Sequence, residues 1–110
     1  MLYELREYLA VDGAADRLHA RFAEHTLRLL ERHGIHVVGF WSDDEDRNRL
    51  VYLIRYDDAA GRDRAWASFR QDPEWPKVRA ASEADGPIVE KMTIRTLTSP
   101  AYWPYLTTRG

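Results

Sequence analysis

A histidine on the first predicted helix is the side chain best suited to acid–base chemistry. Leu18, Phe22 and Leu29 recur there at helical spacing and form one apolar stripe. His25 falls on the same stripe, where the pattern favours an apolar residue, so we expect it to face the sheet. An imidazole titrates near neutral pH and can accept or donate a proton. His25, with the Thr26 hydroxyl beside it, is therefore the candidate catalytic residue; the alternative is a core histidine hydrogen-bonded to a carbonyl or a tyrosine.

Aromatic side chains from several predicted elements form a candidate binding site. They are Phe22, Trp41, Tyr52, Trp66, Phe69 and Trp75. Such residues can wall a pocket for a flat, mostly apolar ligand, with indole N–H and phenol O–H groups as orienting donors. The alternative for each of them is simple core filling. Trp41 and Trp66 are the better candidates for ligand contact.

Charged residues inside the predicted strands need partners if they are buried. Glu4 and Arg6 share one face of the first strand, and Arg55 alternates with apolar residues in the third. We expect Arg55 to pair across strands with Glu4 or Glu90, at the seam of a dimer. A structural role is favoured over a catalytic one for all of these charges.

Neither a metal nor a cofactor is indicated. Gly34 breaks the helix between His33 and His36, and no carboxylate has a matching interval. His19 lies among polar positions. The chain contains no cysteine, which excludes thiolate zinc sites and a cysteine nucleophile. No glycine-rich phosphate loop, nucleophile elbow or Ser-His-Asp order occurs.

Length and charge define the class of protein. A chain of 110 residues is expected to form one domain. A formal net charge of −2 argues against nucleic acid as a partner. No apolar run approaches the roughly 20 residues that span a bilayer, so membrane insertion is not expected. The N-terminus lacks the pattern of a signal peptide, which makes a cytoplasmic location the expectation.

The elements that must position these side chains alternate between strands and helices. The expected strands cover 2–10, 35–41, 50–56 and 88–97; a polar hairpin loop covers 42–49. Asp12-Gly13, Asp57-Asp58 and Asp72-Pro73 are the expected helix starts. Gly34 and Gly86-Pro87 are the expected helix ends. The order β-α-β-β-α-β predicts an α+β, ferredoxin-like fold, with a four-stranded antiparallel sheet and helices on one face.

The third strand, 50–56, is apolar on both faces, although two helices can cover only one face of the sheet. The bare face then needs a partner, and a two-fold homodimer is the commonest solution. We expect residues 1–98 to form this domain. Residues 99–110 form an aromatic and proline-rich tail that packs along a surface or serves as a contact surface through Tyr102, Trp103 and Tyr105.

Four short motifs, in order, resemble the NIPSNAP family over residues 2 to 97. They are Tyr3-Glu4-Leu5-Arg6, Arg32-His33-Gly34, Gly39-Phe40-Trp41 and Asp72-Pro73-Glu74-Trp75. The resemblance implies membership of the dimeric α+β barrel superfamily, with two sheets facing each other. It also implies a ligand site between sheet and helices, and a structural role for Trp75.

The resemblance leaves the function open, because the fold does not determine it. The leading hypothesis is a homodimer that binds a small apolar or aromatic metabolite. It would be a cofactor-independent acid–base enzyme of isomerisation, elimination or oxygenation, with His25 as proton acceptor. The alternatives are a non-enzymatic interaction or ligand-sensing module, and a haem-dependent variant suggested by superfamily relatives.

Overall fold

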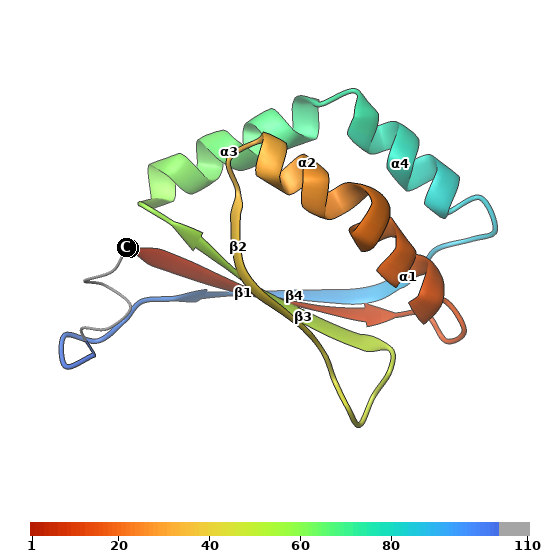
Figure 1. Cartoon of the computed structure of the whole chain (residues 1–110), viewed down its shortest axis with the longest axis horizontal. Helices are drawn as coiled ribbons and strands as arrows, with labels where there is room; N and C mark the ends of the chain where they lie inside the picture. Colours follow the sequence, from red (N-terminus) through yellow and green to blue (C-terminus); the bar gives the residue numbers. More distant parts are fainter. Residues whose placement is uncertain (104–110) are drawn as a thin grey trace.

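The computed structural model describes residues 1–103 of the chain as one antiparallel sheet with its helices on one face (Figure 1). The elements follow the ferredoxin-like order, with a π-helical turn inside the first helical segment and a break in the second. They are β1 (Leu2–Ala10), α1 (Ala15–Arg21), the π-helical turn η1 (Phe22–Thr26), α2 (Leu27–Arg32), β2 (His36–Ser42), β3 (Arg49–Tyr56), α3 (Ala59–Gln71), α4 (Glu74–Ser82) and β4 (Val89–Leu97).

The strand order β2-β3-β1-β4 places β1 and β3 at the centre of the sheet. Every neighbouring pair is antiparallel, so the expected ferredoxin-like fold is confirmed. The register sets Arg6 on β1 directly opposite Tyr52 on β3 and Ile94 on β4. Residues directly opposite each other in an antiparallel pair point to the same face. Arg6, Tyr52 and Ile94 therefore all point toward the helices.

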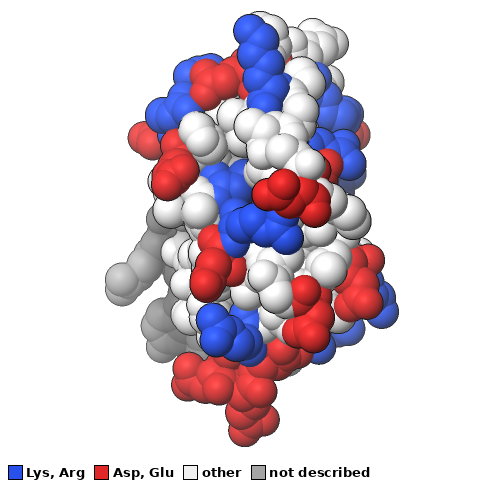
Figure 2. All heavy atoms as spheres, turned by 90° about the vertical axis from the view of Figure 1, so that its right-hand side faces the viewer, with Lys and Arg blue, Asp and Glu red and all other residues white. Residues whose placement is uncertain are grey.

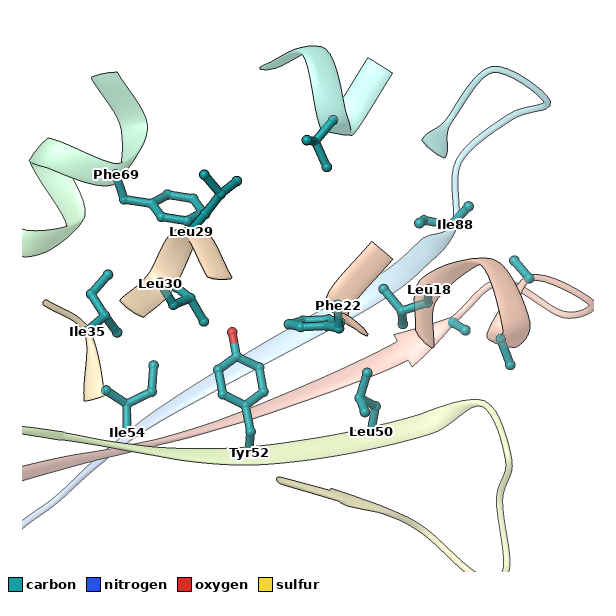
Figure 3. Packing of buried hydrophobic residues seen from close by; sticks show 14 of the residues in the cluster. Leu18, Phe22, Leu29, Leu30, Ile35, Leu50, Tyr52, Ile54, Phe69 and Ile88 are labelled. Atoms are coloured by element: carbon teal, nitrogen blue, oxygen red, sulfur yellow. The ribbon is translucent and has the colours of Figure 1, made fainter. Parts of the chain in front are cut away.

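The apolar core lies between β3 and the helices (Figure 3). Leu50, Tyr52 and Ile54 alternate along β3 and are almost fully buried. Figure 3 shows the Tyr52 ring standing up from β3, with its hydroxyl toward the helices and Phe22 beside it. The Phe40 ring of β2 stacks on Tyr52 at 5.2 Å between centroids. Burial of each such side chain contributes about 1.5–3 kcal/mol to folding.

Two of the three helix starts behave as the sequence predicts. The Asp58 carboxylate accepts a hydrogen bond from the Gly61 N–H at 2.7 Å, at the start of α3. The Asp72 carboxylate accepts one from the Glu74 N–H at 2.9 Å, at the start of α4. Each aspartate satisfies a backbone donor that the first helical turn leaves without an intrahelical partner.

The predicted cap at Asp12-Gly13 is wrong. α1 begins at Ala15, and the residue in the cap position is Ala14, which offers no side-chain acceptor. The other end of this helical segment agrees with the sequence. Gly34 has a φ angle of +73°, a left-handed conformation that glycine adopts without strain.

The loop between β2 and β3 is the exposed hairpin loop that its polar composition predicts. Its acidic residues, 43–46, gather at the tip that points down in Figure 1 and is red at the bottom of Figure 2. Arg49 approaches Asp43 at 3.7 Å and Asp46 at 3.9 Å. Such partly exposed pairs contribute roughly 0–1 kcal/mol each, so we assign this loop no larger role.

The sheet face turned away from the helices carries an apolar strip that includes Trp41, Val51 and Leu53. Val51 is directly opposite Trp41, and Leu53 is directly opposite Gly39. The indole of Trp41 lies directly against Gly39. A Cβ at residue 39 would come within 2.5 Å of the ring, so a larger residue would collide with it. Trp41 is 54% exposed. The glycine of the Gly-Phe-Trp motif thus leaves room for the indole on the open face of the sheet.

Arg55 lies on this open face, directly opposite Tyr3 of β1. Glu4, the next residue along β1, points to the helices, so the predicted Arg55–Glu4 pair is wrong. A pair with Glu90 is excluded as well, because β1 separates β3 from β4. Glu4 instead binds Arg6 on its own strand, with 2.7 Å between the Glu4 Oε1 and Arg6 Nε atoms.

The described chain ends in a turn after β4, in which the Trp103 N–H donates to the Pro100 carbonyl at 3.0 Å. Tyr102 in this turn is 80% exposed. Tyr105, which the sequence places in the aromatic tail, lies outside the described residues. Within residues 1–103, no helix combines the length and apolar character that crossing a membrane requires.

Candidate functional site

A cavity of about 640 Å³ lies between the β1–β4 half of the sheet and helices α3 and α4. Met92 and Ile94 of β4 point toward the helix side of the sheet but remain 46% and 44% exposed, so they form its open side. Aromatic rings and arginines make up most of the remaining wall. The lining residues are Arg6, Tyr8, Arg21, Thr26, Tyr52, Trp66, Phe69, Arg70, Trp75, Arg79, Glu83, Pro87, Val89, Met92 and Ile94.

Three aromatic rings form the helix-side wall of the cavity. Trp66 and Phe69 are three residues apart on α3, so both project from one face of that helix. Trp75 comes from the first turn of α4. The Phe69 centroid lies 5.2 Å from both the Trp66 and the Trp75 centroid. This packing gives a rigid apolar surface suited to a flat ligand.

A closed set of polar contacts holds Arg6 against this wall. The Trp66 Nε1–H donates to the Tyr56 hydroxyl at 2.7 Å, and that hydroxyl donates to Glu4 Oε1 at 3.1 Å. The Arg6 Nε–H donates to the same Glu4 oxygen at 2.7 Å. The Arg6 guanidinium carbon lies 4.0 Å from the centre of the Trp66 ring, a cation–π contact. Arg6 is thereby fixed on both its Nε side and its flat face.

Two phenols lie side by side next to Arg6. The Tyr8 and Tyr52 hydroxyl oxygens are 3.3 Å apart. Burial raises the pKa of Tyr52, and the neighbouring Tyr8 raises it further. Tyr52 therefore stays protonated at neutral pH, where a phenol can donate a hydrogen bond to a ligand oxygen.

Arg21, the last residue of α1, brings a second buried guanidinium to the cavity. Its side chain is 6% exposed. Its Nη1 donates to the Ser82 hydroxyl at 3.2 Å and lies 3.9 Å from Glu83 Oε1. Its Nε is buried and has no hydrogen-bond partner among the described residues. Burial lowers the pKa of Arg21 from its usual value, although a guanidinium remains charged at neutral pH.

The π-helical turn decides which side chains of the first helical segment face inward. The turn adds one residue to the helix, and the Thr26 hydroxyl donates to the Arg21 carbonyl at 3.3 Å. Thr26 is consequently buried, whereas the His25 side chain is 42% exposed. The expected sheet-facing position of His25 is wrong, because the regular helical count cannot anticipate the extra residue. His25 lies instead 4.0 Å from Glu24 and 3.5 Å from an Arg28 nitrogen.

Four of the predicted binding residues converge on the cavity: Thr26, Tyr52, Trp66 and Phe69. Phe22 packs in the core behind them, 5.4 Å from the Tyr52 ring. Trp41 lies on the opposite face of the sheet. His25 borders a separate hollow between α1 and α4, so its role as proton acceptor stays a prediction without support from the geometry.

Arg6, Tyr8 and Arg21 were not predicted as binding residues. Arg6 and Tyr8 share the helix-facing side of β1, and their alternation was visible in the sequence. Arg21 lies three residues after Leu18, so helical spacing already placed it beside the apolar stripe. A charge at such a position was the signal that could have identified it.

A second polar cluster, which we call the clamp, lies outside the cavity. His33 contacts Ser68 at 2.6 Å and Asp72 at 2.7 Å, through Nδ1 and Nε2 respectively. Arg32 donates to Asp72 at 3.0 Å and to Glu74 at 3.2 Å. The clamp, completed by Arg28 against Glu74, consists of Arg28, Arg32, His33, Ser68, Asp72 and Glu74. It ties the end of α2 to the junction of α3 and α4.

The clamp contains a serine, a histidine and an aspartate in contact, but its setting is structural. The His33 hydrogen bond is the main cause of the lowered pKa of Asp72, about 2, and the Glu74 backbone N–H adds to it. Ser68 lies inside α3, where backbone N–H groups already have helical partners and cannot stabilise an oxyanion. The clamp therefore holds helices together and has no oxyanion site beside its hydroxyl.

The two histidines with a metal-like interval do not meet. His33 belongs to the clamp, whereas His36 is on β2, directly opposite Arg55 on the open face of the sheet. Within residues 1–103, no three side chains of histidine, aspartate or glutamate come together as metal ligands.

Comparison with known families identifies the family of this chain. The model of the NIPSNAP family matches residues 3–104, nearly the whole chain. No curated protein matches.

Solved structures share the fold at low sequence identity. An uncharacterised NIPSNAP domain protein from Burkholderia xenovorans has a TM-score of 0.81 at 22% identity, covering 94% of this chain and 99% of its own. A NIPSNAP family protein from Agrobacterium tumefaciens has a TM-score of 0.82 at 14% identity, covering 94% and 97%. A putative antibiotic biosynthesis monooxygenase from Bacteroides thetaiotaomicron has a TM-score of 0.67 at 18% identity, covering 89% and 88%. At such identities the likeness concerns the fold.

Proposed function

Because the chain belongs to the NIPSNAP family, we propose that it binds a small apolar or aromatic metabolite between its sheet and its helices. The cavity beside α3 and α4 is the observation that carries this proposal. Its volume of about 640 Å³ lies within the roughly 300–1,000 Å³ usual for small-molecule sites. Trp66, Phe69 and Trp75 supply the apolar wall, and a few polar groups converge beside it.

The polar groups of the cavity support cofactor-independent chemistry on such a ligand. Tyr8, Tyr52 and Arg6 can stabilise negative charge that develops on a substrate oxygen. Isomerisation, elimination and, with molecular oxygen as co-substrate, oxygenation of a phenolic or enolisable substrate can all proceed through an enolate or a phenolate. Such an anion forms when the substrate gives up a proton, and Glu83, the one carboxylate among the described residues that line the cavity, is the group there that can accept it. We propose an enzyme of this acid–base type, in a cytoplasmic setting.

Native mass spectrometry of the purified protein, compared with its denatured mass, tests the binding proposal. We expect a non-covalent small molecule that dissociates on denaturation. Trp66→Ala should lose this additional mass, whereas Trp103→Ala, in the turn after β4, should keep it. A protein that carries no ligand and binds no aromatic probe at millimolar concentration would overturn the proposal.

We also propose a homodimer in which the open faces of two sheets meet. On this face Trp41 of β2 and Leu97 of β4 are each more than two fifths exposed, and Leu53 lies on β3 between those two strands. Burying such a strip against a second copy removes apolar surface from water. Leu53→Asp should give a monomer, whereas Thr96→Asp on the helix side of β4 should not. A monomeric wild type, or a dimeric Leu53→Asp variant, would contradict this arrangement.

The second candidate function is a non-enzymatic interaction or ligand-sensing module. Exposed Tyr102 and Trp41 favour it, because large exposed aromatic side chains are frequent at protein contacts. Loss of a partner protein on Tyr102→Ala, together with an empty cavity, would select this module over the metabolite-binding protein.

A further inference from the structure

We infer that the cavity recognises a carboxylate, so that its ligand is an organic acid with an apolar or aromatic body. This inference rests on the proposed function and specifies the class of ligand. Two buried arginines, Arg6 from the sheet and Arg21 from α1, flank one pair of phenols. Both guanidinium groups are close enough to Tyr8 and Tyr52 for their charges to interact with them. A pair of cations and a pair of hydroxyl donors thus surround one part of the cavity.

Arg6 is held at the cavity wall by contacts on its Nε side and on its flat face. Its Nε is held by Glu4, and its flat face lies on Trp66. Burial disfavours its charge, but the neighbouring acidic groups, among them the hydrogen-bonded Glu4 carboxylate, outweigh burial and keep the pKa of Arg6 above its usual value. Arg6 is therefore a fixed and permanently charged donor that needs no rearrangement when a ligand binds.

Arg21 carries the sharper signal, because one of its donors is unsatisfied. Its Nη1 is used by Ser82, whereas its buried Nε has no partner among the described residues. Leaving a buried charged donor without a partner is costly. The edge of a guanidinium that includes Nε binds a carboxylate through two parallel hydrogen bonds. A ligand carboxylate at this edge, reached by a small side-chain movement, would supply the missing acceptor.

A purely structural role does not account for Arg21. Its nearest carboxylate, Glu83, is 3.9 Å away and has a second partner in Arg79 at 3.6 Å. Glu83 thus keeps a counter-ion without Arg21. Arg21 also enters the cavity beside Trp75, with 5.5 Å between its guanidinium carbon and the ring centre. This position suits an anionic group whose body lies on the aromatic wall.

The charges at the rim agree with an anionic ligand. Arg70 and Arg79 also line the cavity, and Glu83 is the one carboxylate among the lining residues. A cavity lined mainly by positive charge attracts anions and raises their rate of association. The apolar surfaces of Met92 and Ile94 then leave room for the hydrocarbon body of the acid.

Isothermal titration calorimetry at pH 7 with 2-naphthoate and the neutral 2-naphthamide tests this inference. The two probes share one aromatic body and differ in charge. We expect the wild type to bind the acid about tenfold more tightly, because a charge-assisted hydrogen bond is stronger than the neutral one that the amide makes. Arg21→Met should lose that preference and leave amide binding within about twofold. Arg64→Met, an exposed arginine on α3, is the matched control and should keep it.

The outcomes separate this inference from the proposed function. Equal affinity for acid and amide would overturn the carboxylate site and leave the aromatic cavity standing. Binding of neither probe at millimolar concentration would overturn both. A preference for the acid that survives both Arg21→Met and Arg6→Met would place the anion elsewhere and overturn the inference. If Arg21→Met does not fold, Arg21→Lys replaces it. The comparison of the two probes on the wild type also tests the inference, because it needs no substitution.

Discussion

The clamp and the cavity are both built from arginines, aromatic neighbours and acidic residues, but their hydrogen-bonding groups are satisfied to different degrees. In the clamp, Arg32 donates to Asp72 and Glu74, and His33 uses both ring nitrogens. At the cavity wall, the Arg21 side chain has a buried Nε with no hydrogen-bond partner among the described residues. A saturated network stabilises the fold, whereas an unsaturated donor in a cavity is a site that a ligand can complete.

The comparison also shows what the family motifs do. Arg32-His33-Gly34 and Asp72-Pro73-Glu74 supply most of the clamp, so these motifs hold α2 against the junction of α3 and α4. Trp75, which follows directly, lines the cavity. The residues that make the chain recognisable are thus mainly structural, and two of them, Arg6 and Trp75, also line the cavity.

Asp72→Ala should have the largest effect on stability and little effect on binding. It removes an acceptor for the Glu74 N–H and the partner of His33 and Arg32. We expect the midpoint of thermal unfolding to fall by roughly 5–10 °C. Asp44→Ala in the exposed hairpin loop is the control and should be nearly silent. An unchanged midpoint for Asp72→Ala would remove the clamp from the account of stability.

The clamp should also produce an acid limb of stability. The His33 hydrogen bond and the Glu74 N–H lower the pKa of Asp72 to about 2 in the folded protein, below the roughly 3.9 of an unfolded aspartate. The contribution of the Asp72 carboxylate to the free energy of unfolding is therefore complete above about pH 4 and is lost as pH falls through 2. Urea unfolding measures the free energy of unfolding at each pH. The difference in this free energy between wild type and Asp72→Ala should shrink as pH falls from about 4 to 2. A difference that stays constant down to pH 2 would argue against this assignment.

Arg21→Met sharpens the comparison from the cavity side. Replacement of a poorly satisfied buried charge by an apolar residue of similar length is often neutral or stabilising. We expect the ligand-free variant to be between unchanged and about 2 kcal/mol more stable in urea. A loss of more than about 2 kcal/mol would show that Arg21 is a structural residue like those of the clamp.

Trp66→Phe tests whether the cavity wall depends on its hydrogen bond. The substitution keeps an aromatic ring but removes the N–H that donates to Tyr56. We expect a loss of about 1 kcal/mol in the free energy of unfolding and weaker fixation of Arg6. Trp41→Phe, on the open face, is the matched substitution. Measured on the monomer, it should lower the free energy of unfolding by less than Trp66→Phe does. Equal costs would mean that the Trp66–Tyr56 bond adds nothing.

His25→Ala should have the smallest effect. Its side chain is 42% exposed and lies outside the cavity, so we expect aromatic probes to bind within about twofold of wild type. Calorimetry with 2-naphthoate measures this directly. A large loss of affinity would show that His25 contacts the ligand. It would contradict our conclusion that Thr26, and not His25, faces inward at the π-helical turn.

Much of the fold follows from the sequence, because local signals agree with one another. The alternation over residues 2–10 gives the first strand with its observed bounds, and Asp58 and Asp72 begin their helices as expected. The helix spacing of Trp66 and Phe69 places both in the cavity. Periodicity and capping residues are local properties, so a single chain suffices to detect them.

The missing parts of the site depend on non-local geometry. The prediction that Arg55 pairs with Glu4 is wrong. Alternation shows which residues of one strand share a face, but only the register between strands shows which residues of two strands lie on the same face. Trp41 was misplaced for the same reason. His25 failed because one additional residue in the helix changes the inward side chain, and helix periodicity carries no sign of it.

The π-helical turn also has a consequence for comparing sequences within the family. Residues 22–26 contain one residue more than a regular helix needs, so a relative that lacks this residue would keep both helical halves and the fold. An alignment without a gap here would match Arg21 or Leu29 to residues on a different helical face. Relatives should therefore be compared separately before and after this turn.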